Sequence, residues 1–584
     1  MNGEWSLKEL YSGYDDPRFN GDMAKLDGLC ARFAALAERT EGEPKDVIRS
    51  FLLLSEEIDA LNISLGSYAG LRQAADTTDA ESVSVMGRLM AKNSSLAAPD
   101  AKLRKYIASL DGLDGLIASD PLLSEYSYLL KNIREDDRYM LDASAEEIIS
   151  KYSISGSAAW GDMQQYLTST VEVDCGGEKT NLSDIRNRAY DKDPEVRKSA
   201  YEAELKCYDK IKDAVAFSLN SIKLEVLNRC RLKGYASPLD EALHNARMEK
   251  RTLDALMTAI DEYLPVFHGY MRAKARLLGH EGGLPWYDMF APLGGSDRSF
   301  TAAEAGDFLA GQFAGFDSEL SAMVRRAFDE EWIDFYPRAG KAGGAFCSGV
   351  YTIKQSRILT NFDGSLSDVV TLAHELGHAF HNLNLYGNRI MNTDYSMPVA
   401  ETASTFNETL IMKAVIKEEK DPIKRRALIE SRLMDACQVI CDIYSRYLFE
   451  TAVFENRDEE FMFPDRLCSI MLDCQRKAYG DGLDENFMHP YMWLCKSHYY
   501  SGELSFYNFP YAFGGLLANG LYERYEKDGA AFVPLYKKFL KATAVMSVED
   551  AGRVAGIELT DPDFWRMSLE GFRKETEEFI ALCT

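Results

Sequence analysis

Apolar residues recur at intervals of three and four positions through the first third of the chain, a spacing that predicts amphipathic helices. Two such series are Leu26, Leu29, Phe33, Leu36 and Ala37, and Phe51, Leu54, Ile58, Leu61 and Leu65. Further helices alternate with loops between residues 249 and 335. The pattern therefore predicts a mainly helical protein.

Three short segments break this helical pattern. Leu167–Val173 is rich in β-branched residues and is followed by Cys175 and two glycines, which predicts a hairpin. Gly349–Ile353 and Arg357–Phe362 read as two further strands. The sequence thus predicts a small amount of sheet, part of it directly before the region that carries the chemistry described below.

A helix is expected to begin after the turn Asn361–Gly364. Ser365 or Ser367 can cap it, and Ser365 with Asp368 resembles a capping box. Gly377, within this helix, costs about 1 kcal/mol relative to Ala. We therefore expect a larger side chain at this position to clash with a neighbouring strand or with a bound substrate.

Length and composition narrow the class of protein. A chain of 584 residues with 46% hydrophobic and 27% charged residues predicts a globular protein of more than one lobe. Its net charge of −26 argues against binding to nucleic acid or to an anionic membrane. The absence of a signal-peptide pattern, of a long apolar run and of C-x-x-C among eleven cysteines predicts a cytoplasmic protein with free thiols.

The helix that follows Ser365 contains His374-Glu375-Leu-Gly-His378. Residues four apart lie on one face of a helix, so His374 and His378 can bind one metal ion together. Glu375 points away from that face and is expected to act as a general base beside the ion. The same pattern also arises by chance on purely structural helices.

A catalytic zinc ion needs a third protein ligand and an open position. A third histidine of the metzincin type is excluded, because Asn384 stands where that histidine would be. Glu401 follows His378 by 23 residues, at the start of a further predicted helix, and is expected to be the ligand. Glu408 shares its helix face and is expected to orient a ligating histidine, or else to be an ordinary solvated residue.

Two further segments are candidates for substrate contact. The strand region Arg357, Ile358, Leu359, Thr360 and Asn361 can present a sheet edge to an extended peptide, or can simply support the sheet. The stretch His498–Gly515 is dense in Tyr and Phe. Its phenol and imidazole groups could stabilise an oxyanion, although composition alone favours an aromatic core there.

Asn361–His378 resembles the zinc-motif region of oligoendopeptidase F, a branch of the thimet oligopeptidase family (M3) of zinc metallopeptidases. The likeness extends to Pro398–Glu408, His498–Tyr500, Phe506–Gly514 and Ile557–Trp565, and more weakly to Trp5–Tyr11 and Asp193–Tyr201. It therefore spans nearly the whole chain.

The resemblance implies an elongated, two-lobed helical fold around a deep substrate channel, with a small sheet next to the zinc helix. It implies one zinc ion per chain bound by His374, His378 and Glu401, with Glu375 as the base. It also implies that a histidine and tyrosines of the aromatic stretch contact substrate. In this chain they correspond to His498, Tyr507 and Tyr511.

We expect an N-terminal helical domain over residues 1–195 and a catalytic domain over 196–584. The predicted function is a zinc metalloendopeptidase that cleaves short, unfolded oligopeptides; the sequence does not indicate an oligomeric state. Two alternatives remain. One is a metallocarboxypeptidase with the same helix, and the other is a peptide-binding protein without activity. Glu375 argues against the second, because a general base serves catalysis rather than binding.

Overall fold

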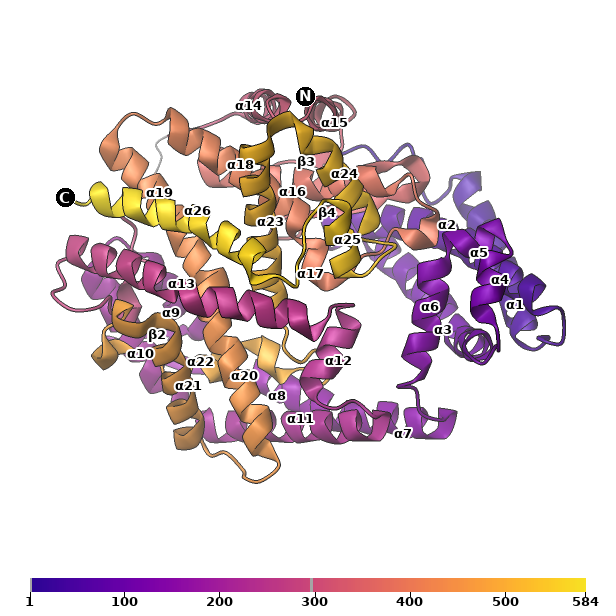
Figure 1. Ribbon diagram of the computed structural model, residues 1–584, viewed down its shortest axis with the longest axis horizontal. Helices are drawn as coiled ribbons and strands as arrows, with labels where there is room; N and C mark the ends of the chain where they lie inside the picture. The colour runs from indigo at the N-terminus through magenta and orange to yellow at the C-terminus, as the bar shows by residue number, and fades with distance from the viewer. Residues whose placement is uncertain (1–2, 295–297) are drawn as a thin grey trace.

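Helices make up most of the computed structural model, which describes residues 3–294 and 298–584 (Figure 1). The N-terminal group comprises α1 (Pro17–Ala37), α2 (Pro44–Ala75), α3 (Ala80–Ala108), α4 (Leu113–Ala118), α5 (Pro121–Glu125) and α6 (Ser127–Asp137). It lies at one end of the molecule, on the right in Figure 1. The mainly helical fold predicted from the sequence is confirmed.

The middle and C-terminal parts of the chain form the remainder of the molecule (Figure 1). The middle helices are α7 (Ala143–Ser153), α8 (Ala159–Thr170), α9 (Leu182–Asn187), α10 (Pro194–Tyr208), α11 (Lys212–Lys233), α12 (Pro238–Asn245) and α13 (Lys250–Leu277). The later helices are α14 (Ala302–Ala314), α15 (Ser318–Asp329), α16 (Leu366–Leu385), α17 (Met397–Ala400), α18 (Thr402–Glu418), α19 (Pro422–Cys437), α20 (Ile443–Arg457), α21 (Pro464–Tyr479), α22 (Met492–Cys495), α23 (Phe509–Asp528), α24 (Val533–Ala542), α25 (Val548–Val554) and α26 (Pro562–Ala581).

Two large groups of buried apolar side chains hold these helices together. The smaller runs from Leu10 to Ile133 and also takes in Val350 from the sheet. The larger runs from Val171 to Phe579. The chain thus passes from the smaller apolar core to the larger one between Ile133 and Val171. The domain boundary at residue 195 and the two-lobed shape with a deep channel stay predictions.

The sheet before α16 has three strands, β3 (Ile333–Asp334), β4 (Phe346–Val350) and β5 (Gln355–Leu359), in the order β3-β5-β4. β5 pairs in parallel with β3 and antiparallel with β4, so both of its edges are occupied. The expectation that a peptide pairs along Arg357, Ile358, Leu359, Thr360 and Asn361 is therefore wrong. In addition, the first three of these side chains are fully buried.

The other predicted strands are close to the observed ones. A hairpin of β1 (Glu172–Cys175) and β2 (Glu178–Asn181) forms around the two glycines, as expected. However, α8 continues to Thr170. Residues 167–170, which were expected to be extended, therefore belong to a helix. Residues 351–353, predicted as strand, form a 3-10 turn instead.

α16 begins where the sequence places it. Ser365 is its N-cap, and the capping box between Ser365 and Asp368 is present, which confirms that prediction. The helix buries Val369, Leu372 and Leu376.

Gly377 allows α16 and α18 to lie in close contact. A Cβ atom at Gly377 would lie 2.5 Å from both the Ala403 carbonyl oxygen and the Ser404 Cα atom. The neighbour is thus the backbone of α18, and not a strand or a substrate as the sequence had suggested. Since backbone atoms cannot rotate away, any larger residue at this position must separate the two helices.

Among the residues that the structure describes, no helix combines the length and the apolar character that crossing a bilayer requires.

We predict that Gly377→Ala lowers the stability of the protein. Overpacking costs about 1–3 kcal/mol, which exceeds the gain of about 1 kcal/mol from the better helix propensity of Ala. The thermal unfolding temperature should therefore fall. Gly87→Ala is the matched control, because Gly87 lies within α3 with no atom near the added Cβ. Equal unfolding temperatures for Gly377→Ala and the unmodified protein would contradict this account.

Candidate metal centre and active site

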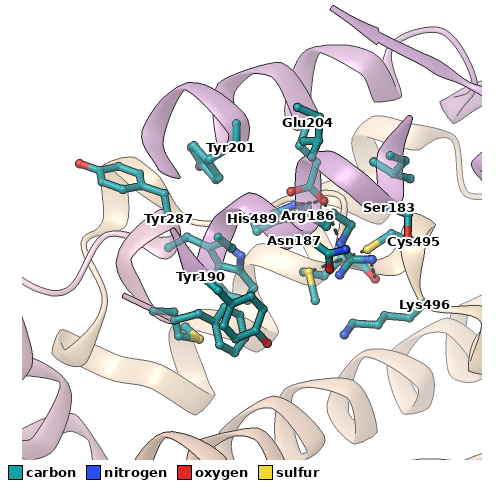
Figure 2. Close-up of a pocket in the computed structure, with 18 of the residues that line it drawn as sticks. Ser183, Arg186, Asn187, Tyr190, Tyr201, Glu204, Tyr287, His489, Cys495 and Lys496 are labelled. Carbon is teal, nitrogen blue, oxygen red and sulfur yellow. Dashed lines mark hydrogen bonds and ion pairs between the residues drawn. The ribbon is translucent and has the colours of Figure 1, made fainter. Parts of the chain in front are cut away.

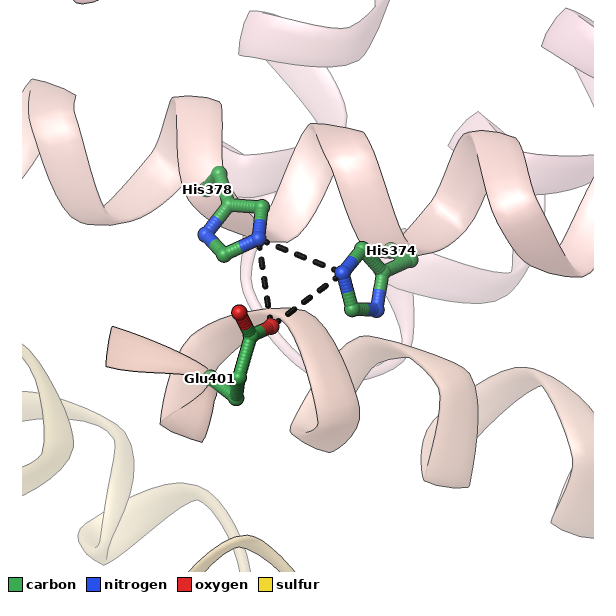
Figure 3. A group of neighbouring side chains, drawn as sticks. All are labelled: His374, His378 and Glu401. Carbon is green, nitrogen blue, oxygen red and sulfur yellow. Dashed lines mark hydrogen bonds and ion pairs between the residues drawn. The ribbon is translucent and has the colours of Figure 1, made fainter. Parts of the chain in front are cut away.

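His374 and His378 lie one helical turn apart on α16 and point toward the same place (Figure 3). Their Nε2 atoms are 3.2 Å apart. Glu401 approaches from the opposite side, and its Oε2 lies 3.2 Å from His374 Nε2 and 3.3 Å from His378 Nε2. Three donor atoms from two segments of the chain therefore converge on one point.

The spacing of these donors suits a zinc ion. Ligands at about 2.0–2.1 Å from a tetrahedral zinc ion lie about 3.3–3.4 Å from one another. The observed separations of 3.2–3.3 Å are close to this value. Two imidazoles and one carboxylate are also a common donor set for catalytic zinc, which leaves a fourth position open.

Glu401 is held in place from two directions. It lies at the junction of α17 and α18, and the Ser404 hydroxyl donates a hydrogen bond of 2.8 Å to its Oε2 atom. The second turn of α23 packs behind it, since a Cβ atom at Gly514 would lie 3.5 Å from Glu401 Cβ. The ligand from the second segment is therefore anchored by its own helix and by α23.

Glu408, on α18, accepts a hydrogen bond from His374 Nδ1. With Nδ1 donating, the lone pair of the imidazole is on Nε2, which is the nitrogen that faces Glu401 and His378. Nearby, the Asn407 side chain donates to the Ala373 carbonyl at 3.2 Å and ties the two helices together. The arrangement is the one expected for a carboxylate that orients a ligating histidine.

The charges around His374 favour a cation at this point. Burial lowers the pKa of His374, but its hydrogen bonds to Glu401 and Glu408 outweigh burial and raise this pKa to about 10. Burial likewise raises the pKa of Glu401, but the two histidines hold it well below the usual range. The site is therefore built around a positive charge, which a divalent ion can supply in place of protons.

Glu375 is only 5% exposed, and its carboxylate makes no hydrogen bond within the described part of the chain. Burial raises its pKa, the change expected for a carboxylate that must take up and release a proton near neutral pH. It lines a cavity of about 660 Å³ together with His374, His378 and Glu401. Its side chain is thus in the same cavity as the convergent donors.

The strand that borders this cavity is β4, not β5. Phe346, Cys347 and Gly349 of β4 line the cavity. One edge of β4 pairs with β5, and within the described residues no strand occupies the other edge. Strand order depends on pairing between distant residues, so no local sequence signal could have identified β4 as the edge.

The residues His498, Tyr507 and Tyr511 form a cluster of their own. The His498 ring stacks on Tyr511 at 5.8 Å and meets Tyr507 edge-on at 5.1 Å. The Tyr507 hydroxyl points to Met397 Sδ of α17 at 3.9 Å. Burial raises the pKa of Tyr511, and the charge of Glu401 adds to this increase. The cluster therefore adjoins Glu401, although none of its members makes a hydrogen bond or ion pair with the three donors within the described structure.

His498 has an unused hydrogen-bonding atom. Its Nδ1 is buried and finds no partner in the described parts of the chain. Burial, followed by the charges of Arg446 and Lys496, lowers the pKa of His498. His498 thus combines a nitrogen that lacks a partner with surroundings that disfavour its charged form.

Comparison with known families identifies relatives. The family described as Peptidase family M3 matches residues 313–571, and the one described as Oligopeptidase F matches residues 96–172. Group B oligopeptidase PepB of Streptococcus agalactiae is 26% identical over 88% of this chain and 87% of its own length. Oligopeptidase PepF of Bacillus subtilis is 25% identical over 99% of this chain and 87% of its own length.

Solved structures share the fold. The crystal structure of oligoendopeptidase-F from Enterococcus faecium superimposes with a TM-score of 0.71 at 18% identity. The match covers 97% of this chain and 98% of the other. At this identity the likeness concerns the arrangement of helices and sheet over essentially the full length of both chains.

We predict that Glu408→Ala lowers zinc affinity by about 10–100-fold, because His374 loses the carboxylate that fixes its orientation. Competition with a chromophoric chelator measures the dissociation constant. Glu418→Ala on the same helix is the control, since Glu418 is exposed and its carboxylate bonds to Gln312. Unchanged zinc affinity in Glu408→Ala would show that His374 needs no such support.

Proposed function

We propose that this chain, a metalloendopeptidase of peptidase family M3, uses zinc to cleave internal bonds of short, unfolded oligopeptides. The zinc ion would be held by His374, His378 and Glu401. The convergence of the three donors at separations of 3.2–3.3 Å carries this proposal. The names of the relatives, which are oligopeptidases, support the substrate class. We expect the enzyme to act in the cytoplasm, where its eleven free cysteines would stay reduced.

A zinc ion at this site would act as a Lewis acid toward the peptide carbonyl and would lower the pKa of the attacking water. Glu375 accepts the proton of that water at its carboxylate and then passes it to the leaving amine. Its burial in the same cavity keeps this proton from bulk solvent.

The substrate backbone pairs with the free edge of β4. Such pairing holds a peptide extended and independent of its sequence, and side chains then alternate between the two faces of the sheet. Phe346, Cys347 and Gly349 place this edge in the same cavity as Glu375. The scissile bond can therefore lie beside the base and the metal ligands together.

We predict that Glu375→Gln abolishes most cleavage while zinc stays bound, because the base is lost and the ligands remain. The loss of kcat should be about 10²–10⁴-fold. The assay is an internally quenched peptide blocked at both ends, with products identified by mass and zinc content measured in parallel. Treatment with a chelator should abolish cleavage as well. Cleavage confined to unblocked peptides, one residue at a time, would identify a carboxypeptidase instead.

His498 and one of the two tyrosines are proposed to donate hydrogen bonds to the oxyanion that develops on the substrate. We predict that Tyr507→Phe or Tyr511→Phe, whichever removes that donor, lowers kcat by about 10²–10³-fold with little change in KM. Tyr166→Phe is the control, because Tyr166 is 66% exposed. If both variants keep full kcat, the tyrosines serve only to pack against His498.

A further inference from the structure

A second cavity, of about 680 Å³, shares no lining residue with the metal-site cavity (Figure 2). It lies between the helices α9 and α10 on one side and α19 on the other. Met492, Cys495 and Lys496 complete the lining. They belong to the segment that directly precedes His498. None of the chemistry described so far uses these residues.

Three cationic side chains line this cavity: Arg186, Arg197 and Lys496. Arg197 is paired with Asp288, which leaves Arg186 and Lys496, both on the same side of Figure 2. Arg186 Nε lies 3.3 Å from Glu204 Oε1, which leaves the outer nitrogens of its guanidinium group available. Lys496 is partly buried and makes no ion pair in the described parts of the chain. Burial lowers its pKa, and the charge of Asp442 opposes this change. A partly desolvated ammonium group without a paired carboxylate is suited to an anion that arrives from outside.

The wall also contains buried polar atoms without partners. The Tyr479 hydroxyl is fully buried, and His489 is 1% exposed. Neither the hydroxyl nor His489 Nδ1 has a hydrogen-bond partner among the described residues. His489 Nε2 also makes no hydrogen bond there, although it lies 3.3 Å from Glu204 Oε1. With the ring proton on Nε2, toward that carboxylate, Nδ1 is left as an acceptor. Buried polar groups are normally satisfied, so these two point to a ligand with both an acceptor and an N–H group.

Three acidic side chains also line the wall, Glu204, Asp435 and Asp442. Asp435 has no ion pair among the described residues, and burial raises its pKa to about 6, whereas the other two are engaged by neighbouring groups. Glu204 is engaged by Arg186, His489 and the Tyr208 hydroxyl. Asp442 is paired with Arg446. The remaining lining is largely aromatic or thioether: Tyr190, Trp286, Tyr287, Met289, Phe290 and Met434. This surface suits an apolar side chain next to the anionic group.

The cavity borders the metal centre. Lys496 is close enough to His498 for its charge to lower the pKa of that histidine, after burial and Arg446. Asp435, in the cavity wall on α19, has its pKa raised to about 6 by burial and then by the charge of Glu408. Two residues of the cavity wall are thus close enough for charges to act between Lys496 and His498 and between Asp435 and Glu408.

We propose that this cavity binds the C-terminal residue of the oligopeptide substrate, with its α-carboxylate held by Lys496 and Arg186. The Tyr479 hydroxyl donates to the same carboxylate, and His489 Nδ1 accepts the N–H group of the last residue. This inference rests on the proposed function. A fixed C-terminus sets how many residues separate the chain end from the scissile bond, and so favours short substrates with a free carboxylate.

Binding tests the inference independently of catalysis. Two peptides of one sequence, a C-terminal free acid and its amide, carry a fluorophore on the N-terminus, and the Glu375→Gln protein is titrated against each. We expect the acid to bind about tenfold more tightly than the amide, because one charge-assisted hydrogen bond contributes about this factor to the affinity. Lys496→Met should abolish this preference by weakening only the acid, and Lys496→Arg should preserve it.

The control is Lys206→Met, which removes an exposed lysine of α10 and should change neither affinity. Equal binding of acid and amide, binding of neither, or equal weakening of both by Lys496→Met would overturn the inference. Cleavage assays with the unmodified protein distinguish a failure of this inference from a failure of the proposed function. If both peptides are cleaved equally well and bound equally, only the C-terminal site fails. If the acid is bound selectively but neither peptide is cleaved, the proposed function fails and the site stands.

Discussion

The close contact between α16 and α18 at Gly377 is the constraint on which the metal site depends. Because this residue has no side chain, the backbone of Ala403 and Ser404 can lie directly against α16. Glu401 and Glu408 then fall on either side of that contact and reach both nitrogens of His374. The geometry of the donors is therefore a consequence of helix packing rather than of the histidine motif alone.

The electrostatic design follows from the same packing. Two carboxylates and two imidazoles share a partly buried space, so each histidine is polarised toward the point where the donors meet. Glu375 is directed to a different side of α16, where burial raises its pKa. The chain thus separates the residues that hold a cation from the residue that moves a proton, although His374 and Glu375 are neighbours in sequence.

Local signals predicted much of this arrangement. The capping box at Ser365 and the H-E-x-x-H pattern both act within a few residues, so they can be read directly from the sequence. The strand order was beyond such reasoning, because β5 pairs with a strand more than twenty residues earlier as well as with its neighbour β4. The reason for Gly377 was also misjudged, since the helix that touches it lies 26 residues further along the chain.

The central claim is that His374, His378 and Glu401 together hold one catalytic zinc ion. X-ray absorption at the zinc edge of the zinc-loaded protein tests it most directly. The account predicts one zinc per chain, coordinated by two imidazole nitrogens and oxygen ligands at about 2.0–2.2 Å, with no sulfur. Coordination by cysteine sulfur, a single imidazole, or the lack of stoichiometric zinc would contradict it.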